Sequence, residues 1–179
     1  MPPPGLPHFP RELDLCITGR CNLKCRYCFY ADEMAARNDL PTERWFALFE
    51  EVGKLGVQRL CLTGGEVFTR ADIFELIDGI IANRMRYSLL TNGTLISRDA
   101  LAKFAVGKRR LRLDSIQVSI DGSRAEIHDQ SRPPESFDRA LAGLRLLKEA
   151  GFPVTVRVTV NRTNLDDLPN IARLLLEDV

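Results

Sequence analysis

The alternation of short apolar runs with amphipathic stretches constrains the fold of this chain more than any other feature of its sequence. From Leu13 onward, five runs rich in β-branched and apolar residues each precede a stretch with helical spacing. Five β-α pairs in strict alternation predict a parallel sheet with right-handed crossovers. The expected strands are Leu13–Thr18, Val57–Thr63, Tyr87–Thr91, Ser115–Ile120 and Val154–Val160, and the expected helices are Thr42–Leu55, Asp72–Asn83, Ser97–Ala105, Ser136–Ala150 and Asp167–Asp178.

Local signals mark the ends of these helices and their apolar faces. Thr42 is a candidate N-cap for the first helix, and Gly56 and Gly151 follow the ends of two helices, where a left-handed residue is favoured. Pro169 suits the first turn of the last helix. In the first helix, the residues expected to face the core are Trp45, Leu48, Phe49, Val52 and Leu55.

Two closures fit five β-α pairs: an open doubly wound sheet or part of a β/α barrel. Both place ligands at the carboxyl ends of the strands. The residues just after each strand are therefore the candidates for function.

Composition narrows the class of protein. The chain has 179 residues, enough for one domain, which we place at residues 13–179 behind a Pro-rich arm at residues 1–12. The net charge of +1 gives no field that would attract nucleic acid or an anionic membrane, and the basic patch Gly107–Arg112 is expected to be a solvated loop. No apolar run approaches the roughly 18–20 residues of a membrane span. The first ten residues lack the pattern of a signal peptide, so a reducing cytoplasm is the expected compartment.

Three of the five cysteines lie in the stretch RCNLKCRYCFY that follows the first strand. The spacing C-x3-C-x2-C of Cys21, Cys25 and Cys28 lets three thiolates converge on one inorganic centre. A structural zinc site needs four protein ligands, but Cys16 and Cys61 lie inside expected strands. Three thiolates around a four-iron cluster would leave one iron open to a ligand. An iron–sulfur centre is favoured, and zinc binding or cysteines without a metal stay open.

The ends of the other strands carry weaker signals. Gly64 and Gly65 would let a ligand approach the backbone closely, and Glu66 would add a carboxylate suited to an ammonium group. Ser119 and Asp121 could bind the hydroxyls of a sugar. Each pattern is also an ordinary turn sequence, as is TNGT after the third strand. Together these patterns carry more weight, because each follows a different strand and the carboxyl ends of the strands should meet at one mouth of the fold.

At this point the chain resembles the radical S-adenosylmethionine (SAM) superfamily, through its CNLKCRYC, GGE and SIDG motifs. The resemblance covers Leu13 to about Leu168 and implies a partial TIM-like barrel. It implies that Cys21, Cys25 and Cys28 hold a 4Fe-4S cluster whose open iron binds SAM. One electron from the cluster would cleave SAM to a 5′-deoxyadenosyl radical that abstracts hydrogen from the substrate, without an acid–base dyad. The residues implied to contact SAM are Tyr27 near the adenine, Gly64, Gly65 and Glu66 at the ammonium, Ser119 and Asp121 near the ribose, and Val160 with Asn161 in the adenine pocket.

Within the superfamily, Ser119–Gly151 resembles the branch that modifies peptides and proteins, such as sulfatase-maturing enzymes. The resemblance therefore implies a peptide or protein substrate and a flavodoxin- or ferredoxin-like reductant. Arg132 could reach the SAM carboxylate or the substrate. His128 and Asp129 are expected to belong to a hydrogen-bonded loop before a helix.

The chain departs from the family pattern in two places. Val67 stands where a proline usually follows GGE, and only five β-α pairs are present where the family core has six. The chain is therefore expected to be a fragment truncated at its carboxyl end. A non-catalytic zinc module, or a fragment that holds the cluster without turnover, are the alternatives. Cys16 and Cys61 are expected to be core thiols whose replacement by alanine would cost stability.

Overall fold

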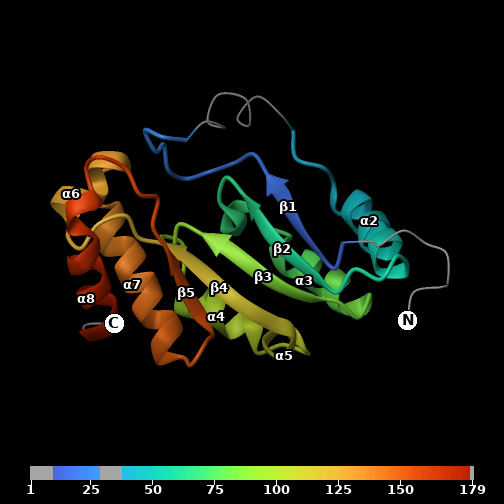
Figure 1. The fold of residues 1–179 in the computed structure, drawn as a ribbon. Coiled ribbons are helices and arrows are strands. Elements are labelled where there is room, and N and C mark those ends of the chain that lie inside the picture. The colour runs from blue at the N-terminus through green and yellow to red at the C-terminus, as the bar shows by residue number, and fades with distance from the viewer. Residues whose placement is uncertain (1–9, 29–37, 178–179) are drawn as a thin grey trace.

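The five expected strands form one parallel sheet in a computed structural model, which describes residues 10–28 and 38–177. The strands pair in the order in which they occur in the chain (Figure 1). Most of the Pro-rich arm lies outside the described residues. The strands are β1 (Glu12–Thr18), β2 (Arg59–Gly64), β3 (Arg86–Thr91), β4 (Leu113–Ser119) and β5 (Val154–Arg157).

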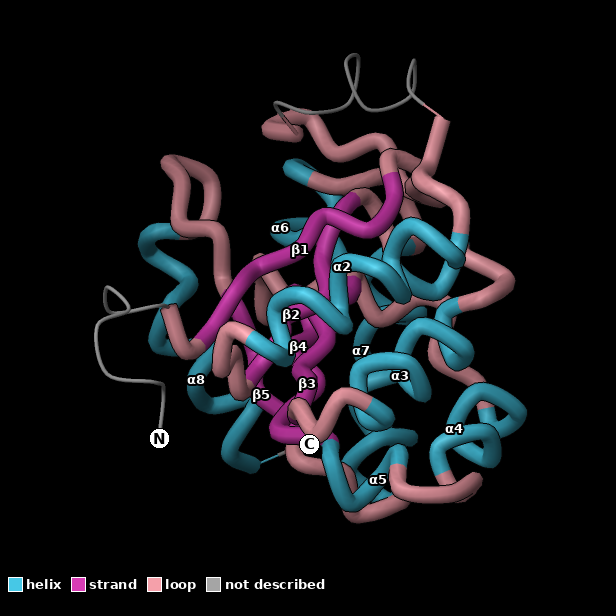
Figure 2. The backbone as a smooth tube through the Cα atoms, turned by 90° about the vertical axis from the view of Figure 1, so that its right-hand side faces the viewer, coloured by secondary structure: helices cyan, strands magenta, loops and turns pink. Residues whose placement is uncertain are grey.

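The strand order decides between the two closures left open by the sequence. A doubly wound sheet reverses its strand order at a switch point, whereas this sheet runs β1-β2-β3-β4-β5 without reversal. Helices α3, α4 and α7 consequently lie on the same side of the strands (Figure 2). The fold is a partial barrel. The helices between and after the strands are α2 (Thr42–Lys54), α3 (Ile73–Ala82), α4 (Arg98–Phe104), α7 (Ser136–Glu149) and α8 (Leu168–Glu177).

The two faces of the sheet differ in burial because alternate residues point to opposite sides. Side chains facing the helices form the core, and Leu62, Leu89 and Ile116 are fully buried there. We call the opposite side the open face. Cys61 on β2 and its partner Ser88 on β3 lie on it and are only half-buried. The open face also carries Asp14, Cys16, Thr63, Leu90, Gln117 and Ser119.

The start of α2 differs from the expectation. Thr42 does not cap the helix; Pro41 precedes it, with no side-chain cap. Thr42 Oγ1 instead donates a hydrogen bond of 2.6 Å to Asp72 Oδ2. The threonine thereby ties α2 to the beginning of α3. Of the predicted core residues of α2, Trp45, Phe49 and Val52 are buried, whereas Leu48 and Leu55 are half-buried.

The structure contains short elements that the sequence pattern did not predict. They are α5 (Arg109–Arg112), α6 (Ala125–Ser131), and the 3-10 turns η1 (Val67–Thr69) and η2 (Leu165–Asp167). Each is seven residues or shorter, too short for apolar periodicity to be visible.

Strand β5 is shorter than expected, ending at Arg157 rather than at Val160. The last ladder bond runs from Ile120 N–H to Arg157 O. Two residues later, Thr159 N–H donates to the side chain of Asp121 instead of to a neighbouring strand. Val160 therefore lies beyond the strand and is 55% exposed.

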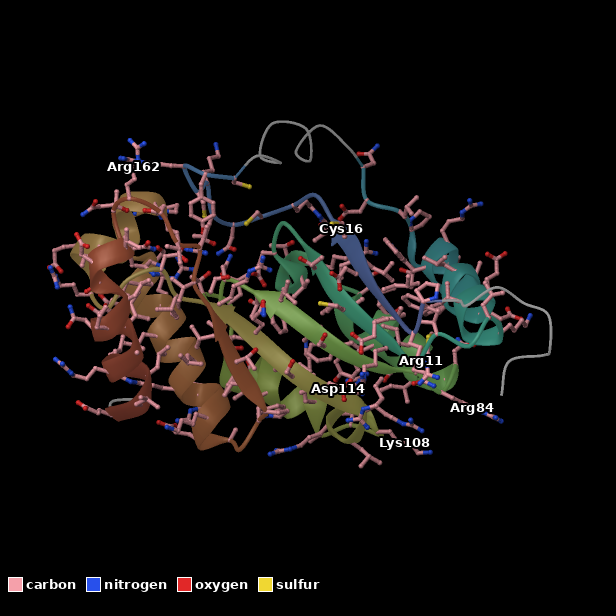
Figure 3. All side chains as sticks on the ribbon, viewed as in Figure 1. Arg11, Cys16, Arg84, Lys108, Asp114 and Arg162 are labelled. Atoms are coloured by element: carbon pink, nitrogen blue, oxygen red, sulfur yellow. The ribbon has the colours of Figure 1, made fainter. Side chains whose placement is uncertain are left out.

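The basic patch at Gly107–Arg112 is more embedded than the solvated loop we expected. Arg109 forms an ion pair with Asp78 and lies 5.1 Å from the centre of the Phe74 ring. Lys108 remains exposed. Figure 3 shows Lys108 at the end of the sheet opposite to Cys16, so this patch is remote from the carboxyl ends of the strands. Within residues 10–28 and 38–177, no helix is long and apolar enough to cross a membrane.

Candidate iron–sulfur and SAM site

The cysteine loop follows β1 and extends across the carboxyl ends of the strands toward α6 (Figure 1). Its first part is held by the turn after β2. Gly65 N–H donates to Thr18 O at 2.9 Å, and Glu66 N–H donates to Arg20 O at 2.8 Å. The beginning of the loop is therefore fixed by backbone hydrogen bonds before any ligand is considered.

The two glycines of the GGE motif have a packing role that the sequence did not reveal. A Cβ on Gly64 would lie 2.4 Å from Thr18 O, and one on Gly65 would lie 2.3 Å from Arg20 O. Gly64 also has a φ of +142°, which side chains disfavour. We expected the glycines to admit a ligand, but they admit the backbone of the cysteine loop.

Glu66 is not at the mouth, where we expected its carboxylate. The residue is 0% exposed. Its Oε2 accepts the N–H of Asn92 at 2.7 Å, and its Oε1 accepts Thr91 Oγ1 at 2.8 Å and Phe68 N–H at 3.2 Å. Burial raises the pKa of Glu66, and these donors oppose the rise. The carboxylate joins the turns after β2 and β3 because those turns expose backbone N–H groups that need acceptors.

The turn after β3 contacts the cysteine loop, although its TNGT sequence suggested only a turn. Asn92 Nδ2 donates to Asn22 Oδ1 at 2.9 Å and lies 4.0 Å from Cys21 Sγ. Asn22 in turn donates to Thr94 Oγ1 at 2.8 Å. The signal that could have found these residues is their position after a strand of the parallel sheet, next to the GGE turn.

The second half of the loop is attached to β4 and α6. Arg26 N–H donates to Ser131 O at 2.9 Å, and Tyr27 Oη donates to Asp121 Oδ2 at 2.7 Å. Arg132 Nε also donates to Asp121 Oδ2, at 2.6 Å. Its guanidinium hydrogen-bonds Tyr27 Oη and lies 5.6 Å from the centre of the Tyr27 ring.

Asp121, which we expected beside a ribose, uses its carboxylate for hydrogen bonds within the protein. The residue is 1% exposed, and its Oδ1 accepts Thr159 N–H at 2.8 Å. With Tyr27 and Arg132 on Oδ2, the carboxylate has three donors. Arg132 is itself 7% exposed and forms a buried ion pair with Asp121. The guanidinium that we expected to reach SAM or substrate is thus used within the chain.

Two other residues predicted to contact SAM, Ser119 and Val160, are not enclosed by the protein. Ser119 ends β4 on the open face, opposite Arg157, and is half-buried. Val160 is exposed in the segment after β5. Asn161, its neighbour, is bonded within the chain: its Oδ1 accepts Thr163 N–H at 2.8 Å, and its Nδ2 donates to Ser131 Oγ at 3.1 Å.

His128 and Asp129 were expected in a hydrogen-bonded loop, and the structure places both in helix α6. His128 Nδ1 accepts Asp121 N–H at 3.0 Å. Asp129 accepts the backbone N–H groups of Glu135 and Phe137, at 2.9 and 3.1 Å, at the start of α7. The hydrogen-bonded structural role holds, but the backbone around these residues is helical.

The three loop thiols differ in exposure: Cys21 and Cys28 are exposed and Cys25 is half-buried. Burial raises the pKa of the Cys25 thiol, with Cys21 and Cys28 acting in the same direction, while the charge of Arg132 lowers it. Cys21 Sγ accepts Leu23 N–H at 3.4 Å. Cys21 and Cys28 therefore lie close enough to Cys25 to affect the pKa of its thiol.

In the part of the chain that the structure describes, no three Cys, His, Asp or Glu side chains converge closely enough to hold a metal ion. The loop is thus an open set of three thiols rather than a closed site. Cys16, the nearest cysteine in sequence, lies on the open face and is not a core thiol as expected, since it is exposed; Cys61 is half-buried. Three accessible thiols on one anchored loop fit the donor set of a cluster with three protein ligands. They fit a four-ligand zinc site less well.

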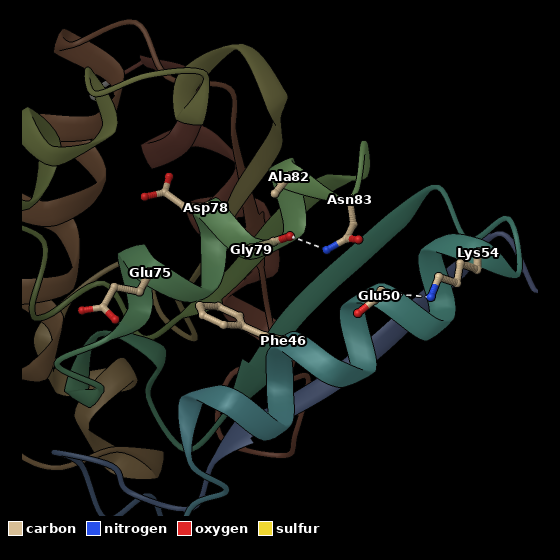
Figure 4. Close-up of a pocket in the computed structure, with 8 residues that line it drawn as sticks. All are labelled: Phe46, Glu50, Lys54, Glu75, Asp78, Gly79, Ala82 and Asn83. Atoms are coloured by element: carbon tan, nitrogen blue, oxygen red, sulfur yellow. Dashed lines mark hydrogen bonds and ion pairs between the residues drawn. The ribbon is translucent and has the colours of Figure 1, made fainter.

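A groove between α2 and α3 has a volume of about 770 Å³ and lies on the helical side of the sheet (Figure 4). Phe46 and Gly79 line it. Two of its carboxylates are already paired, Glu50 with Lys54 and Asp78 with Arg109. The groove is separate from the cysteine loop and contains none of the predicted site residues.

The geometry places three thiols, a glycine turn and the end of β4 at one mouth of a partial barrel. Residues 15–175 match the radical SAM superfamily. The chain belongs to this superfamily. The anchored cysteine loop is the segment that carries its CxxxCxxC motif.

Relatives of this chain include a heme synthase and a mycofactocin maturase. It is 36% identical over 171 residues to AdoMet-dependent heme synthase of Methanosarcina barkeri, covering 94% of this chain and 48% of that protein. It is 33% identical over 173 residues to mycofactocin maturase MftC of Mycolicibacterium smegmatis, covering 93% and 43%. The chain spans less than half the length of these relatives.

A solved structure confirms the fold at low sequence identity. SuiB of Streptococcus suis, bound to S-adenosylmethionine, superposes with a TM-score of 0.80 at 20% identity. The match covers 95% of this chain and 39% of SuiB. The partial barrel predicted from the sequence is therefore confirmed.

Proposed function

We propose that this chain forms the core of a radical SAM enzyme, in which Cys21, Cys25 and Cys28 hold a 4Fe-4S cluster. The observation that carries the proposal is the open set of three thiols on a loop that backbone hydrogen bonds at Arg20 and Arg26 hold over the carboxyl ends of the strands. A cluster held there would pass an electron from an external reductant to SAM, which is the chemistry that generates a radical for hydrogen abstraction. The chain's own part is to position the thiols and to orient SAM.

The residues proposed to hold SAM follow from which atoms the protein leaves free. Because the carboxylate of Glu66 is buried and bonded, and the N–H groups of Gly65 and Glu66 bond the cysteine loop, we propose that the turn Gly64, Gly65 and Glu66 receives the ammonium group through its carbonyl oxygens. Ser119 at the end of β4 is proposed for the ribose. Val160 is exposed and Tyr27 is 37% exposed, so both can present apolar surface to the adenine. We propose no SAM contact for the side chains of Asp121 and Arg132.

A peptide or protein is the proposed substrate. The likeness to mycofactocin maturase supports this class, as does the resemblance of Ser119–Gly151 to peptide-modifying members. A tetrapyrrole is the second candidate, favoured by the 36% identity to a heme synthase. A cytoplasmic location and a flavodoxin- or ferredoxin-like reductant complete the proposal.

The proposal is tested by anaerobic reconstitution of the chain with iron and sulfide. We expect about four irons per chain and, after reduction, an electron paramagnetic resonance signal that changes shape when SAM is added. Cys25→Ala should abolish the signal. Cys16→Ala is the matched control because Cys16 is also an exposed thiol, and it should leave iron content unchanged.

Iron content that is indifferent to Cys25→Ala would contradict the proposal, and zinc bound in its place would favour the non-catalytic module. A cluster signal that ignores SAM would mean that the chain holds the cluster without forming the SAM site. For the substrate class, iron-coproporphyrin can be titrated into the reconstituted chain. A shift of its Soret band, absent with Cys25→Ala protein lacking the cluster, would favour the tetrapyrrole.

A further inference from the structure

We propose that Asp121, Arg132 and Tyr27 form a latch that positions the Cys25–Cys28 half of the cysteine loop. The latch is a property of the folded chain itself. Its consequence for the cluster rests on the function proposed above. In this view Asp121 and Arg132 are positioning residues, and neither is a ligand of SAM.

The two halves of the cysteine loop are held by different neighbours. The Cys21 half contacts the turns after β2 and β3 through Arg20 O and Asn22. Within the described residues, the hydrogen bonds that join the Cys25–Cys28 half to the rest of the fold run from Arg26 N–H to Ser131 O and between the Tyr27 hydroxyl, Asp121 and Arg132. The Tyr27 hydroxyl is therefore the side-chain connection between this half of the loop and the barrel.

Asp121, which accepts the hydrogen bond of that hydroxyl, is held by hydrogen bonds to both its backbone and its side chain. Asp121 N–H donates to His128 at 3.0 Å, and Asp121 O accepts Asn164 Nδ2 at 2.9 Å. Its carboxylate accepts Thr159 N–H at 2.8 Å and Arg132 Nε at 2.6 Å. The end of β4, helix α6 and the segment after β5 thus meet at one buried residue. A residue held this rigidly also positions the groups that bond to it. Tyr27 is the bonded residue that lies in the cysteine loop, between Cys25 and Cys28.

The shape of Arg132 suits it to this role. Its planar guanidinium donates through Nε to Asp121 and through Nη2 to Tyr27 Oη. A lysine could keep the charge opposite Asp121, but its ammonium lacks the planar fork that presents Nε to Asp121 and Nη2 to Tyr27. Arg132→Lys should therefore weaken the hold on Tyr27, whose hydroxyl keeps its own bond to Asp121, while retaining a charge in the buried pair.

The test without cluster is limited proteolysis of the apo chain with trypsin. Lys24 and Arg26 are exposed cleavage sites in the loop. We expect Tyr27→Phe and Arg132→Lys to raise the rate of cleavage after Arg26 by about tenfold, because hydrogen bonds to charged groups contribute that much to local closure. Mass spectrometry of the released peptides separates these sites from others.

Tyr87→Phe is the matched control. Tyr87 also donates its hydroxyl, to Arg109 O at 2.9 Å, but it lies in the core at the other end of the fold. It should leave cleavage after Arg26 unchanged. Equal rates for wild type, Tyr27→Phe and Tyr87→Phe would overturn the latch.

The second readout is the rate at which a chelator removes iron from the reconstituted protein. Tyr27→Phe should lose iron several-fold faster than wild type and Tyr87→Phe. If wild type binds no cluster, the proposed function fails, while the proteolysis result still judges the latch. If wild type and Tyr27→Phe lose iron at the same rate, the latch does not position the thiols, and the proposed function stands.

Discussion

At the scale of single residues, the two acids after strand ends behave alike. Glu66 and Asp121 both suggested ligand contacts, and both are buried with three donors on their carboxylates. A strand end in a barrel brings several turns together, and their N–H groups must find acceptors. A carboxylate that satisfies such groups holds the turns around the mouth together.

His128 gives this organisation a pH dependence. Burial lowers its pKa to about 4, and the charge of Arg132 acts in the same direction. The unfolded chain, with a pKa near 6.5, binds a proton before the folded chain does. The stability from this group is therefore complete above about pH 6.5 and lost as pH falls toward 4. Between pH 7 and pH 5 we expect wild type to lose about 2 kcal/mol of unfolding free energy through this group.

His128→Asn is the variant that isolates the effect, since its amide oxygen can still accept Asp121 N–H. Urea unfolding of both proteins at pH 7 and pH 5 measures the difference, because the remaining groups titrate in both. Equal losses in the two proteins would show that His128 is not held neutral.

At the scale of elements, two helical glycines show how packing overrides propensity. A Cβ on Gly143 of α7 would lie 2.2 Å from the backbone oxygen of Gly93, in the turn after β3. A Cβ on Gly79 of α3 would lie 2.7 Å from the ring of Phe46, which is 40% exposed and borders the groove in Figure 4, and 3.3 Å from the ring of the buried Phe49. A ring at the surface can move, whereas a backbone turn under the site cannot.

Alanine at these two positions should therefore have opposite effects. Alanine is favoured over glycine in a helix by about 1 kcal/mol. We expect Gly143→Ala to lower the free energy of unfolding by about 1–3 kcal/mol, because overpacking outweighs that gain. Gly79→Ala should leave the free energy unchanged or raise it by up to about 1 kcal/mol. Denaturation midpoints of both variants check the pair, and equal destabilisation would contradict it.

At the scale of the whole molecule, the helices of the described part of the chain cover one face of the sheet and leave the other face open. This asymmetry explains why Cys16 is exposed although it lies in a strand. A strand residue is buried only if its own side of the sheet is covered, and the sequential strand order sends the helices to the other side.

Thiol chemistry tests the open face. We expect Cys16 of the native apo chain to react with iodoacetamide, and Cys61 to react more slowly, because burial raises its pKa. Cys16→Ala should change the free energy of unfolding by no more than about 0.5 kcal/mol. Peptide mapping after alkylation identifies each site. Protection of Cys16 until the chain unfolds would show that this face is covered.

The sequence by itself determined the five β-α pairs and the cysteine spacing, because both are local patterns. Helical spacing, cap residues and strand-forming runs predicted helices α2, α3, α4, α7 and α8 to within one residue at each end, and strands β1 to β4 to within two. The motif spacing of Cys21, Cys25 and Cys28 likewise identified the superfamily that the comparison confirmed.

Only the tertiary structure decided which polar side chains at the mouth remain free. The motifs predict SAM contacts for Glu66, Asp121 and Arg132, but a motif cannot show which donors and acceptors of the chain surround these side chains. Those donors come from turns up to 94 residues away in the sequence, as the bond from Tyr27 to Asp121 shows. Buried polar groups must be paired, and the partners are chosen by how the strands bring distant loops together.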